Sequence, residues 1–257
     1  MKFSWFWLFI RVLGSLVLLF VIAPLVGMAL HTSFPSLMAA GQDAEVTSSI
    51  WLTIWVSMMA TLFFALLGVP LAFVLARKEF PLKSLVQGIV DLPVVIPHSA
   101  AGIALLGFIS RDSSLGRVAS LAGLDLVGHP IGIAIAMAFV SIPFLVNAAR
   151  DGFAMVPERY EKAALTLGAS PVRVFFTISI PLAWRSVVSG MVMMFARGMS
   201  EFGAVIIVAY HPMVAPVLVY ERFSTFGLAY SRPAALLFIL VSLAVFVLIR
   251  LLLRKKQ

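Results

Sequence analysis

Residues 51–75 read WLTIWVSMMATLFFALLGVPLAFVL and contain no charged side chain. A helix needs about 20 mainly apolar residues to cross the hydrocarbon core of a membrane, and this stretch exceeds that length. It is followed by Arg77-Lys78-Glu79, three consecutive charges that mark a return to water. We therefore predict a membrane-spanning helix over 51–75.

Composition indicates that most of the chain consists of such helices. Hydrophobic residues make up 62% of the 257 residues and charged residues only 12%, against roughly 45–50% and about 25% in soluble domains. The chain contains no cysteine, which excludes disulfides, thiol catalysis and cysteine-bound metals. The net charge of +8 comes from basic residues between apolar blocks, which is a pattern of membrane topology rather than of nucleic-acid binding.

Five further apolar stretches have a similar length, so we predict an all-α membrane protein with six transmembrane helices. The five cover residues 6–30, 85–109, 131–149, 187–210 and 233–253. The first follows Lys2 as a signal peptide would, but it is longer than the apolar region of a signal peptide, which has about 7–15 residues. We therefore keep it as a helix of the mature protein.

The positions of Lys and Arg predict the orientation in the membrane. An even number of helices places both termini on one side, together with the loops 76–84 and 150–186. That side receives 14 basic residues and the other side four, while Arg197 alone lies within a helix. Because cytoplasmic loops carry an excess of Lys and Arg, we predict a multi-pass protein of the cell membrane with both termini in the cytoplasm.

The loop 150–186 is long enough to contain structure of its own. Pro157 suits the first turn of a helix, and Gly168 suits the position just after its end. Between them, apolar residues recur at helical spacing at Tyr160, Ala163, Ala164 and Leu167. A short amphipathic helix of this kind fits either a groove in a partner protein or the membrane surface, and the residues alone favour neither.

A spaced motif runs through the same loop. Its positions are Glu161, Lys162, Ala163, Ala164, Gly168, Ile178, Ile180 and Pro181. The pattern resembles the EAA loop of ABC importer permeases, in which Glu-Ala-Ala is followed at fixed spacing by Gly and then Ile-x-Leu-Pro. Lys162 takes the place of the family's Glu, although Glu161 is adjacent, and Ile180 takes the place of Leu. The resemblance implies a short cytoplasmic coupling helix between membrane helices 4 and 5 that docks on an ATP-binding subunit.

Other segments extend the resemblance over most of the chain. Residues 91–98 (DLPVVIPH) and 197–204 (RGMSEFGA) resemble the third-helix and fifth-helix segments of molybdate, tungstate and sulfate permeases. Residues 210–216 (YHPMVAP) and 220–223 (YERF) look most like archaeal-type molybdate/tungstate permeases. The chain thus resembles the permease subunit of a molybdate/tungstate-type ABC importer with the type I importer fold.

The resemblance also implies a function and partners. Two copies of the chain would form a path for a tetrahedral oxyanion, molybdate or tungstate, with two ATPase subunits docked below and an extracytoplasmic binding protein delivering the anion. This chain has no G-x-x-x-x-G-K-[ST] phosphate loop, so ATP and Mg²⁺ would be bound by the partner, and no enzyme activity or cofactor is expected here. Residues 1–46 would form the first helix and external loop, 47–253 the importer domain and 254–257 a basic cytoplasmic tail.

A few polar or helix-breaking residues are expected at membrane depth, where ionisable side chains are costly and rare. Arg197 and Glu201 are four residues apart and can pair on one helical face, either as a structural pair or as part of the translocation path. Pro93 and Pro97 should distort the third helix, which is tolerated next to protein or a water-filled cavity. His98 follows, either as a satisfied buried histidine or as a ligand or proton relay. These five are the candidates for the path.

Three other functions compete with this interpretation. A sulfate or thiosulfate ABC permease would have nearly the same sequence features. A stand-alone secondary transporter would have more intramembrane charge and often repeated halves, and neither is evident. A membrane-embedded enzyme would need a clustered nucleophile, metal site or acid/base set. The four histidines are scattered, so we predict no metal site and no catalytic residue.

Overall fold

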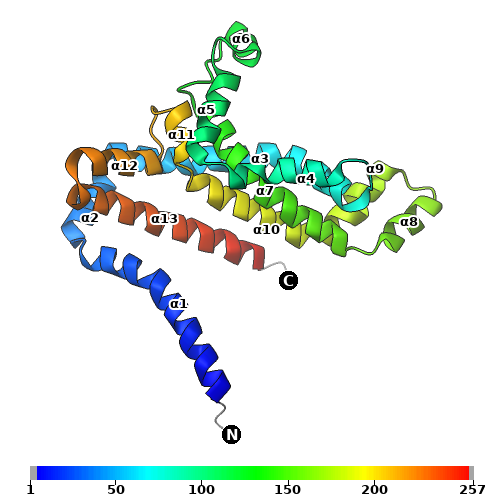
Figure 1. Ribbon diagram of the computed structural model, residues 1–257, viewed down its shortest axis with the longest axis horizontal. Coiled ribbons are helices and arrows are strands. Elements are labelled where there is room, and N and C mark those ends of the chain that lie inside the picture. Colours follow the sequence, from blue (N-terminus) through cyan, green and yellow to red (C-terminus); the bar gives the residue numbers. More distant parts are fainter. Residues whose placement is uncertain (1–4, 255–257) are drawn as a thin grey trace.

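The computed structural model describes residues 5–254, and all regular structure in that range is helical (Figure 1). The elements are α1 (Trp5–Leu30), α2 (Phe34–Gln42), α3 (Ala44–Arg77), α4 (Lys83–Val95), α5 (His98–Ile109), α6 (Ser114–Leu121), α7 (Pro130–Met155), α8 (Glu158–Thr166), α9 (Pro171–Val174), the π-helix η1 (Phe175–Ser179), α10 (Ile180–Met199), α11 (Gly203–Val208), α12 (Ala215–Phe226) and α13 (Leu228–Arg254). The predicted all-α class is confirmed. The predicted tail, 254–257, lies outside the described residues except for Arg254 at the end of α13.

Five helical segments are long and apolar enough to cross a membrane: α1, α3, α7, the continuous run from α9 to α10, and α13. The pair α4 and α5 passes the same test together, although the two helices are bent by 112° at the break between them. Counted as one broken span, this pair completes the six predicted spans. The limits predicted for the fifth span, 187–210, were wrong, because its helix begins before residue 187 and ends at Met199.

The centre of the bundle is α7, which packs between α3 and α10 (Figure 1). Ile133, Met137 and Leu145 of α7 are fully enclosed. On α3 the buried face consists mainly of small residues at helical spacing, including Ser49, Thr53, Ser57, Ala60, Ala65, Gly68 and Ala72. Membrane helices gain little from hydrophobic association and pack instead through small residues that let backbones approach. The small face of α3 therefore explains its close packing on α7.

Charged contacts join the loops at each end of the bundle. At one end, Arg222 of α12 donates to Asp43 (2.7 Å) and Glu45 (2.9 Å) at the start of α3. Burial raises the pKa of the Asp43 carboxyl, but hydrogen bonds from Arg222 and from backbone N–H groups outweigh it and leave the pKa below its usual value. At the other end, Arg77 of α3 contacts Glu161 of α8. These contacts confirm that the loops 76–84 and 150–186 share one end.

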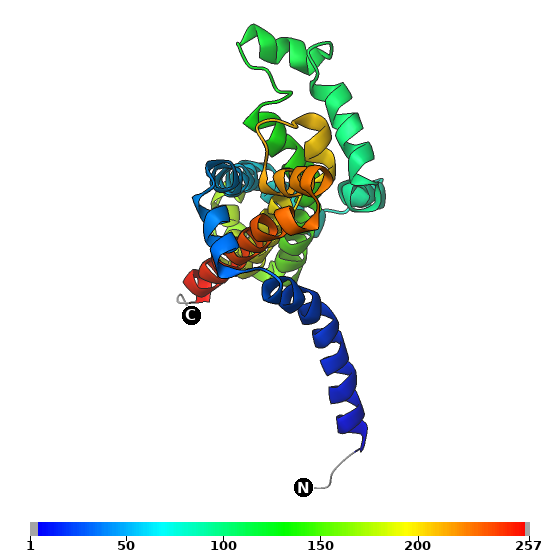
Figure 2. The same ribbon diagram turned by 90° about the vertical axis from the view of Figure 1, so that its left-hand side faces the viewer.

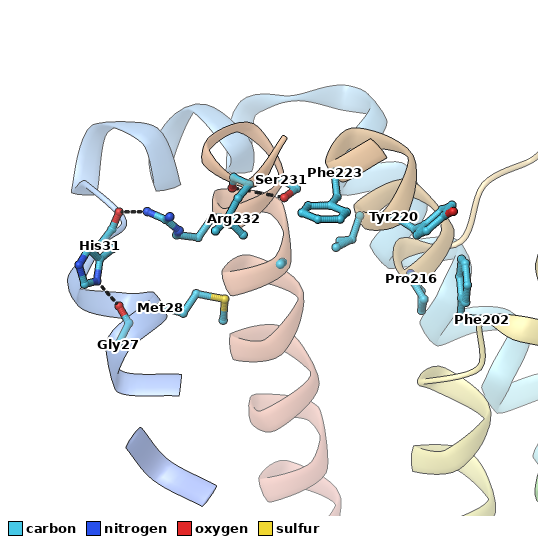
Figure 3. A pocket seen from close by; sticks show the side chains of 12 residues that line it. Gly27, Met28, His31, Phe202, Pro216, Tyr220, Phe223, Ser231 and Arg232 are labelled. Atoms are coloured by element: carbon cyan, nitrogen blue, oxygen red, sulfur yellow. Dashed lines mark hydrogen bonds between the residues drawn. The ribbon is translucent and has the colours of Figure 1, made fainter. Parts of the chain in front are cut away.

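The helix α1 lies apart from the other helices in both views (Figures 1 and 2). None of its residues is buried, and its C-terminal end is tied to α13 by a hydrogen bond from Arg232 to the carbonyl of His31 (2.7 Å). A mainly apolar groove of about 680 Å³ lies beside this contact, with Tyr220 and Phe223 of α12 on its opposite wall (Figure 3). Almost all of the apolar surface of α1 therefore has no neighbour among the described residues.

Candidate translocation path and coupling loop

The break between α4 and α5 is caused by Pro97. A proline has no N–H to donate, and it forces the preceding residue out of the helical region. Ile96 accordingly has an extended backbone (φ −75°, ψ 146°), and α5 begins at His98. Pro93 was also expected to distort the helix, but α4 continues through it, and Pro93 is buried. The two prolines therefore differ, since only Pro97 ends a helix.

A second break follows α10 and lies beside the first. The helix α10 ends at Met199, and α11 begins at Gly203. A Cβ atom on Gly203 would lie 2.8 Å from the Cβ atom of His98, so only glycine permits this approach of α11 to the start of α5. Between the two helices, the enclosed Glu201 accepts a hydrogen bond from the backbone N–H of Ala204 (2.9 Å). This contact stabilises the first turn of α11.

The two breaks bring three ionisable side chains together. The Nη2 atom of Arg197 lies 2.9 Å from Oε2 of Glu201 and 2.8 Å from Nδ1 of His98. The same His98 nitrogen lies 3.0 Å from Oε2 of Glu201. The Glu201 side chain is fully enclosed, whereas the side chains of Arg197 and His98 are 21% and 35% exposed. The Arg197–His98–Glu201 cluster therefore presents Arg197 and His98 to the surface and keeps the carboxylate behind them.

The structure confirms part of the predicted arrangement and changes the rest. Arg197 and Glu201 pair as expected, but they do not share a continuous helix, because Glu201 lies beyond the end of α10. His98 was expected either as a satisfied buried histidine or as a ligand or proton relay; it is partly exposed and contacts both partners. His98 and Arg197 are 99 residues apart in the sequence, so helical spacing could not predict that they are in contact.

One further polar contact within the membrane region was not predicted. Asn147 of α7 donates to Asp91 of α4 at 2.6 Å, and both residues are partly buried. A hydrogen bond from a neutral amide holds α4 against α7 without introducing a second charge. No pattern of spacing links these two residues, which are 56 positions apart.

The loop 150–186, our candidate coupling loop, contains the helix that the sequence predicted. The helix α8 covers Glu158–Thr166 and follows Pro157, which occupies the N-cap position rather than the first turn. Gly168 has a φ of +87°, and the N–H groups of Gly168 and Ala169 return to carbonyls of the last turn at 3.0 Å. Such a closure at positive φ is a common helix end. The loop then reverses toward α9.

The residues of the EAA-like motif are distributed over two faces. Lys162 and Ala163 are exposed and Ala164 is half-buried, and Lys162 pairs with Glu158 across one turn at 2.8 Å. Glu161 is the exception, because it points inward and is buried. Ile178 lies in η1 and Pro181 in the first turn of α10, on the segment that connects the loop to the membrane. Sequence reasoning missed the inward partners of Glu161, namely Arg77 and Ser179.

The Arg197–His98–Glu201 cluster places a partly exposed, largely neutralised guanidinium where two helix breaks meet. Arg197 carries the positive charge, but the carboxylate 2.9 Å away neutralises most of its field. Non-helical backbone at membrane depth is tolerated where it is covered by protein or lines a water-filled cavity. The cluster therefore suits transient contact with an anion better than tight binding.

The sequence places this chain in a known family. It belongs to the family of binding-protein-dependent transport system inner membrane components, whose pattern matches residues 68–257. Among similar proteins, the molybdate/tungstate transport system permease protein WtpB of Pyrococcus abyssi is 43% identical over 95% of this chain and 94% of its own length. WtpB of Methanocaldococcus jannaschii is 40% identical over 92% of both chains. The chain is thus a membrane-spanning permease subunit, as the motifs predicted.

More distant relatives and solved structures agree with this family and fold. A probable sulfate transport system permease protein, cysT of Chlorokybus atmophyticus, is 30% identical over 95% of this chain and 86% of its own length. A bacterial ABC transporter involved in the import of the acidic polysaccharide alginate superposes with a TM-score of 0.74 at 17% identity, covering 97% of this chain and 96% of that one. The latter likeness confirms the importer fold. Family membership also favours an importer subunit over a stand-alone secondary transporter.

Proposed function

We propose that this chain forms the translocation path of an ATP-driven importer for molybdate or tungstate. The observation that carries the proposal is its identity of 40–43% with molybdate/tungstate permeases over nearly the whole length of both chains. The similarity to a probable sulfate permease is lower, at 30%, which makes sulfate the second candidate. An oxyanion-binding protein delivers the anion outside the cell, and two ATPase subunits supply the energy.

The Arg197–His98–Glu201 cluster is our candidate for a gate along the path. Two helix breaks meet there, and the cluster offers a partly exposed guanidinium without a strong net charge. An importer must release its substrate, so a site that binds the anion weakly serves passage better than a tight one. Pro97 contributes by ending α4 and so placing His98 beside Arg197. Pro93 stays a candidate for the path as a buried residue inside α4.

The path is completed by a second copy of the chain. Support for this comes from α1, which is mainly apolar on all sides, apart from Arg11 near its N-terminal end, and has no buried residue. A helix that is hydrophobic all round is covered by lipid or by other helices. We propose that α1 packs on the partner copy on one side and faces lipid on the other. The homodimer thereby offers two copies of α8 to two ATPase subunits.

The exposed face of α8 docks on the ATPase subunit. Tyr160 is 45% exposed and Leu167 is 88% exposed, and Ala163 between them is small enough to let another surface approach. An exposed apolar face on a short helix at the end of a membrane bundle favours insertion into a groove. ATP and Mg²⁺ are bound by the ATPase, and this chain contributes no cofactor.

The proposed substrate is tested by transport in a defined system. The chain is reconstituted in liposomes with its ATPase subunit inside and its binding protein outside, and uptake of molybdate, tungstate and sulfate is compared. We expect uptake of molybdate or tungstate that requires ATP and the binding protein, with sulfate at background. Uptake of sulfate alone would establish the second candidate, and uptake without the ATPase would refute the importer mechanism.

The orientation in the membrane is a separate prediction. Because the loops near Arg77 and Glu161 and the two terminal segments together carry 14 of the 19 basic residues, we place that end, and both termini, in the cytoplasm. Reporter fusions after Gln257 and within the loop 31–50 should report opposite sides of the membrane, with the Gln257 fusion inside. A cytoplasmic signal from both fusions would rule out this topology.

A further inference from the structure

One carboxylate of α8, that of Glu161, points away from the proposed docking face. Glu161 is the buried residue of α8, whereas Tyr160 and Leu165 of the same helix are 45% and 44% exposed. Side chains of α8 therefore make few contacts with the rest of the chain. The attachment of α8 to the membrane helices depends on Glu161 and on the backbone at the two ends of the helix.

Arg77 holds this carboxylate with a forked contact. Its Nε atom donates to both carboxylate oxygens of Glu161 (3.1 and 3.0 Å), and its Nη2 atom donates to Oε1 at 2.9 Å. Ser179 donates its hydroxyl to the same Oε1 at 2.9 Å. The Arg77 and Glu161 side chains are only 7% and 11% exposed. Planar guanidinium–carboxylate contacts fix orientation as well as distance.

The same contact joins the ends of several helices. Arg77 is the last residue of α3, and its Nη2 atom also donates to the carbonyl of Val156, the C-cap of α7 (2.8 Å). Ser179 is the last residue of η1 and directly precedes α10. One ion pair therefore links α8 to α3, α7 and α10, which are the helices that form the core of the bundle.

The surroundings keep water away from this ion pair. The rings of Phe73, Phe153 and Phe175 pack edge to face or tilted, with centroids 4.9–6.3 Å apart, in one apolar cluster with Val156, whose carbonyl accepts from Arg77. Charged contacts are stronger where the medium is less polarisable. The π-helix η1 places Ser179 against Glu161 while Phe175 packs inward. Segments of π-helix are rare in proteins overall, and those that occur are often found at functional sites.

We infer that Arg77 and Glu161 are positioning residues that clamp α8 to the ends of α3, α7 and α10. This inference rests on the proposed function of α8 as the ATPase docking helix. Motion imposed on α8 by the ATPase is carried to α3 and α10 through the clamp instead of being absorbed by bending of the loop. The Arg197–His98–Glu201 cluster at the far end of α10 is then moved by the same displacement.

The clamp is tested first in the permease alone. The chain has no natural cysteine, so spin labels can be placed at Lys78 and Thr166, and the distance between them measured in lipid nanodiscs. We expect one narrow distance in the parent chain and a broad distribution after Arg77→Met or Glu161→Gln. Glu79→Gln, which removes the exposed Lys83 pair nearby, is the control and should leave the distance narrow. A narrow distance in Arg77→Met would overturn the clamp.

The second measurement concerns coupling in the complete transporter. Arg77→Met should still co-purify with the ATPase, because the outer face of α8 is unchanged, but anion transported per ATP hydrolysed should fall by about tenfold or more, within the usual range of coupling between sites. The exchanged pair, Arg77→Glu with Glu161→Arg, should recover part of the loss.

Should a single variant fail to fold, the apolar pair Arg77→Met with Glu161→Leu tests the same point, because well-packed apolar pairs commonly replace buried ion pairs without loss of stability. This pair should assemble and still transport less per ATP than the parent. Normal transport per ATP by the apolar pair would overturn the clamp. A parent chain that transports no oxyanion but shows the narrow label distance would instead contradict the proposed function and leave the clamp supported.

Discussion

Replacing Glu201 with alanine is expected to destabilise the protein more than any other single change within the membrane. Glu201 is fully enclosed and pairs with Arg197 at 2.9 Å, and it also accepts the N–H of Ala204. Removing one partner of a buried ion pair typically costs about 3–5 kcal/mol, because the other charge is left uncompensated. Arg197 is partly exposed, so we expect the lower part of that range. The measurement is thermal unfolding of the purified protein in detergent.

A double variant separates a structural role of this pair from a role in transport. Arg197→Met with Glu201→Ala removes both charges, so it should recover much of the stability lost in Glu201→Ala. If the cluster lies on the path, oxyanion uptake by the double variant should still be strongly reduced. Uptake at the parental rate by a stable double variant would show that the pair only holds the two helix breaks together. Glu201→Gln, which keeps an oxygen for Ala204, should be intermediate in stability.

Replacing Gly168 with valine is expected to abolish coupling to the ATPase while leaving membrane insertion intact. Gly168 has a φ of +87°, a conformation that is strongly disfavoured for a β-branched residue. Apart from residue 168 itself and its two neighbours in the chain, no atom would lie within 4 Å of a Cβ atom at this position, so the penalty comes from the backbone and not from a clash with other parts of the structure. The turn after α8 must then change its conformation, and this change alters the direction in which the chain continues to α9 and Pro181.

The matched control is Gly168→Asn, because asparagine tolerates positive φ far better than valine does. Co-purification with the ATPase subunit and stimulation of ATP hydrolysis by loaded binding protein should be lost in the valine variant and largely kept in the asparagine variant. Ala164→Glu, which adds charge and bulk to α8 without altering the turn, should weaken co-purification as well. Normal assembly and stimulation in both Gly168→Val and Ala164→Glu would show that α8 is not the coupling element.

Short sequence patterns predicted the features that depend on neighbouring residues in the chain, namely the membrane spans and the ends of α8. Apolar length located the membrane spans, as residues 51–75 within α3 illustrate. Pro157 and Gly168 set the limits of α8 to within a residue, because a helix end depends on the backbone preferences of the residues that form it. The family motifs also predicted the transporter class, because a motif consists of residue types at fixed spacing along the chain and can be identified without the tertiary structure.

The sequence by itself therefore determined the approximate number and positions of the membrane-spanning helices, the helix α8, and which loops share an end of the bundle. Only the tertiary structure decided that His98 joins Arg197 and Glu201, that α10 stops at Met199, and that Glu161 turns inward to Arg77. Glu161 and Arg77 are 84 positions apart, and a carboxylate next to an exposed lysine gives no local sign of burial. Ion pairs of this kind form where packing brings the charged nitrogen and oxygen atoms within about 4 Å of each other, and that approach depends on the small residues and broken helices of the whole bundle.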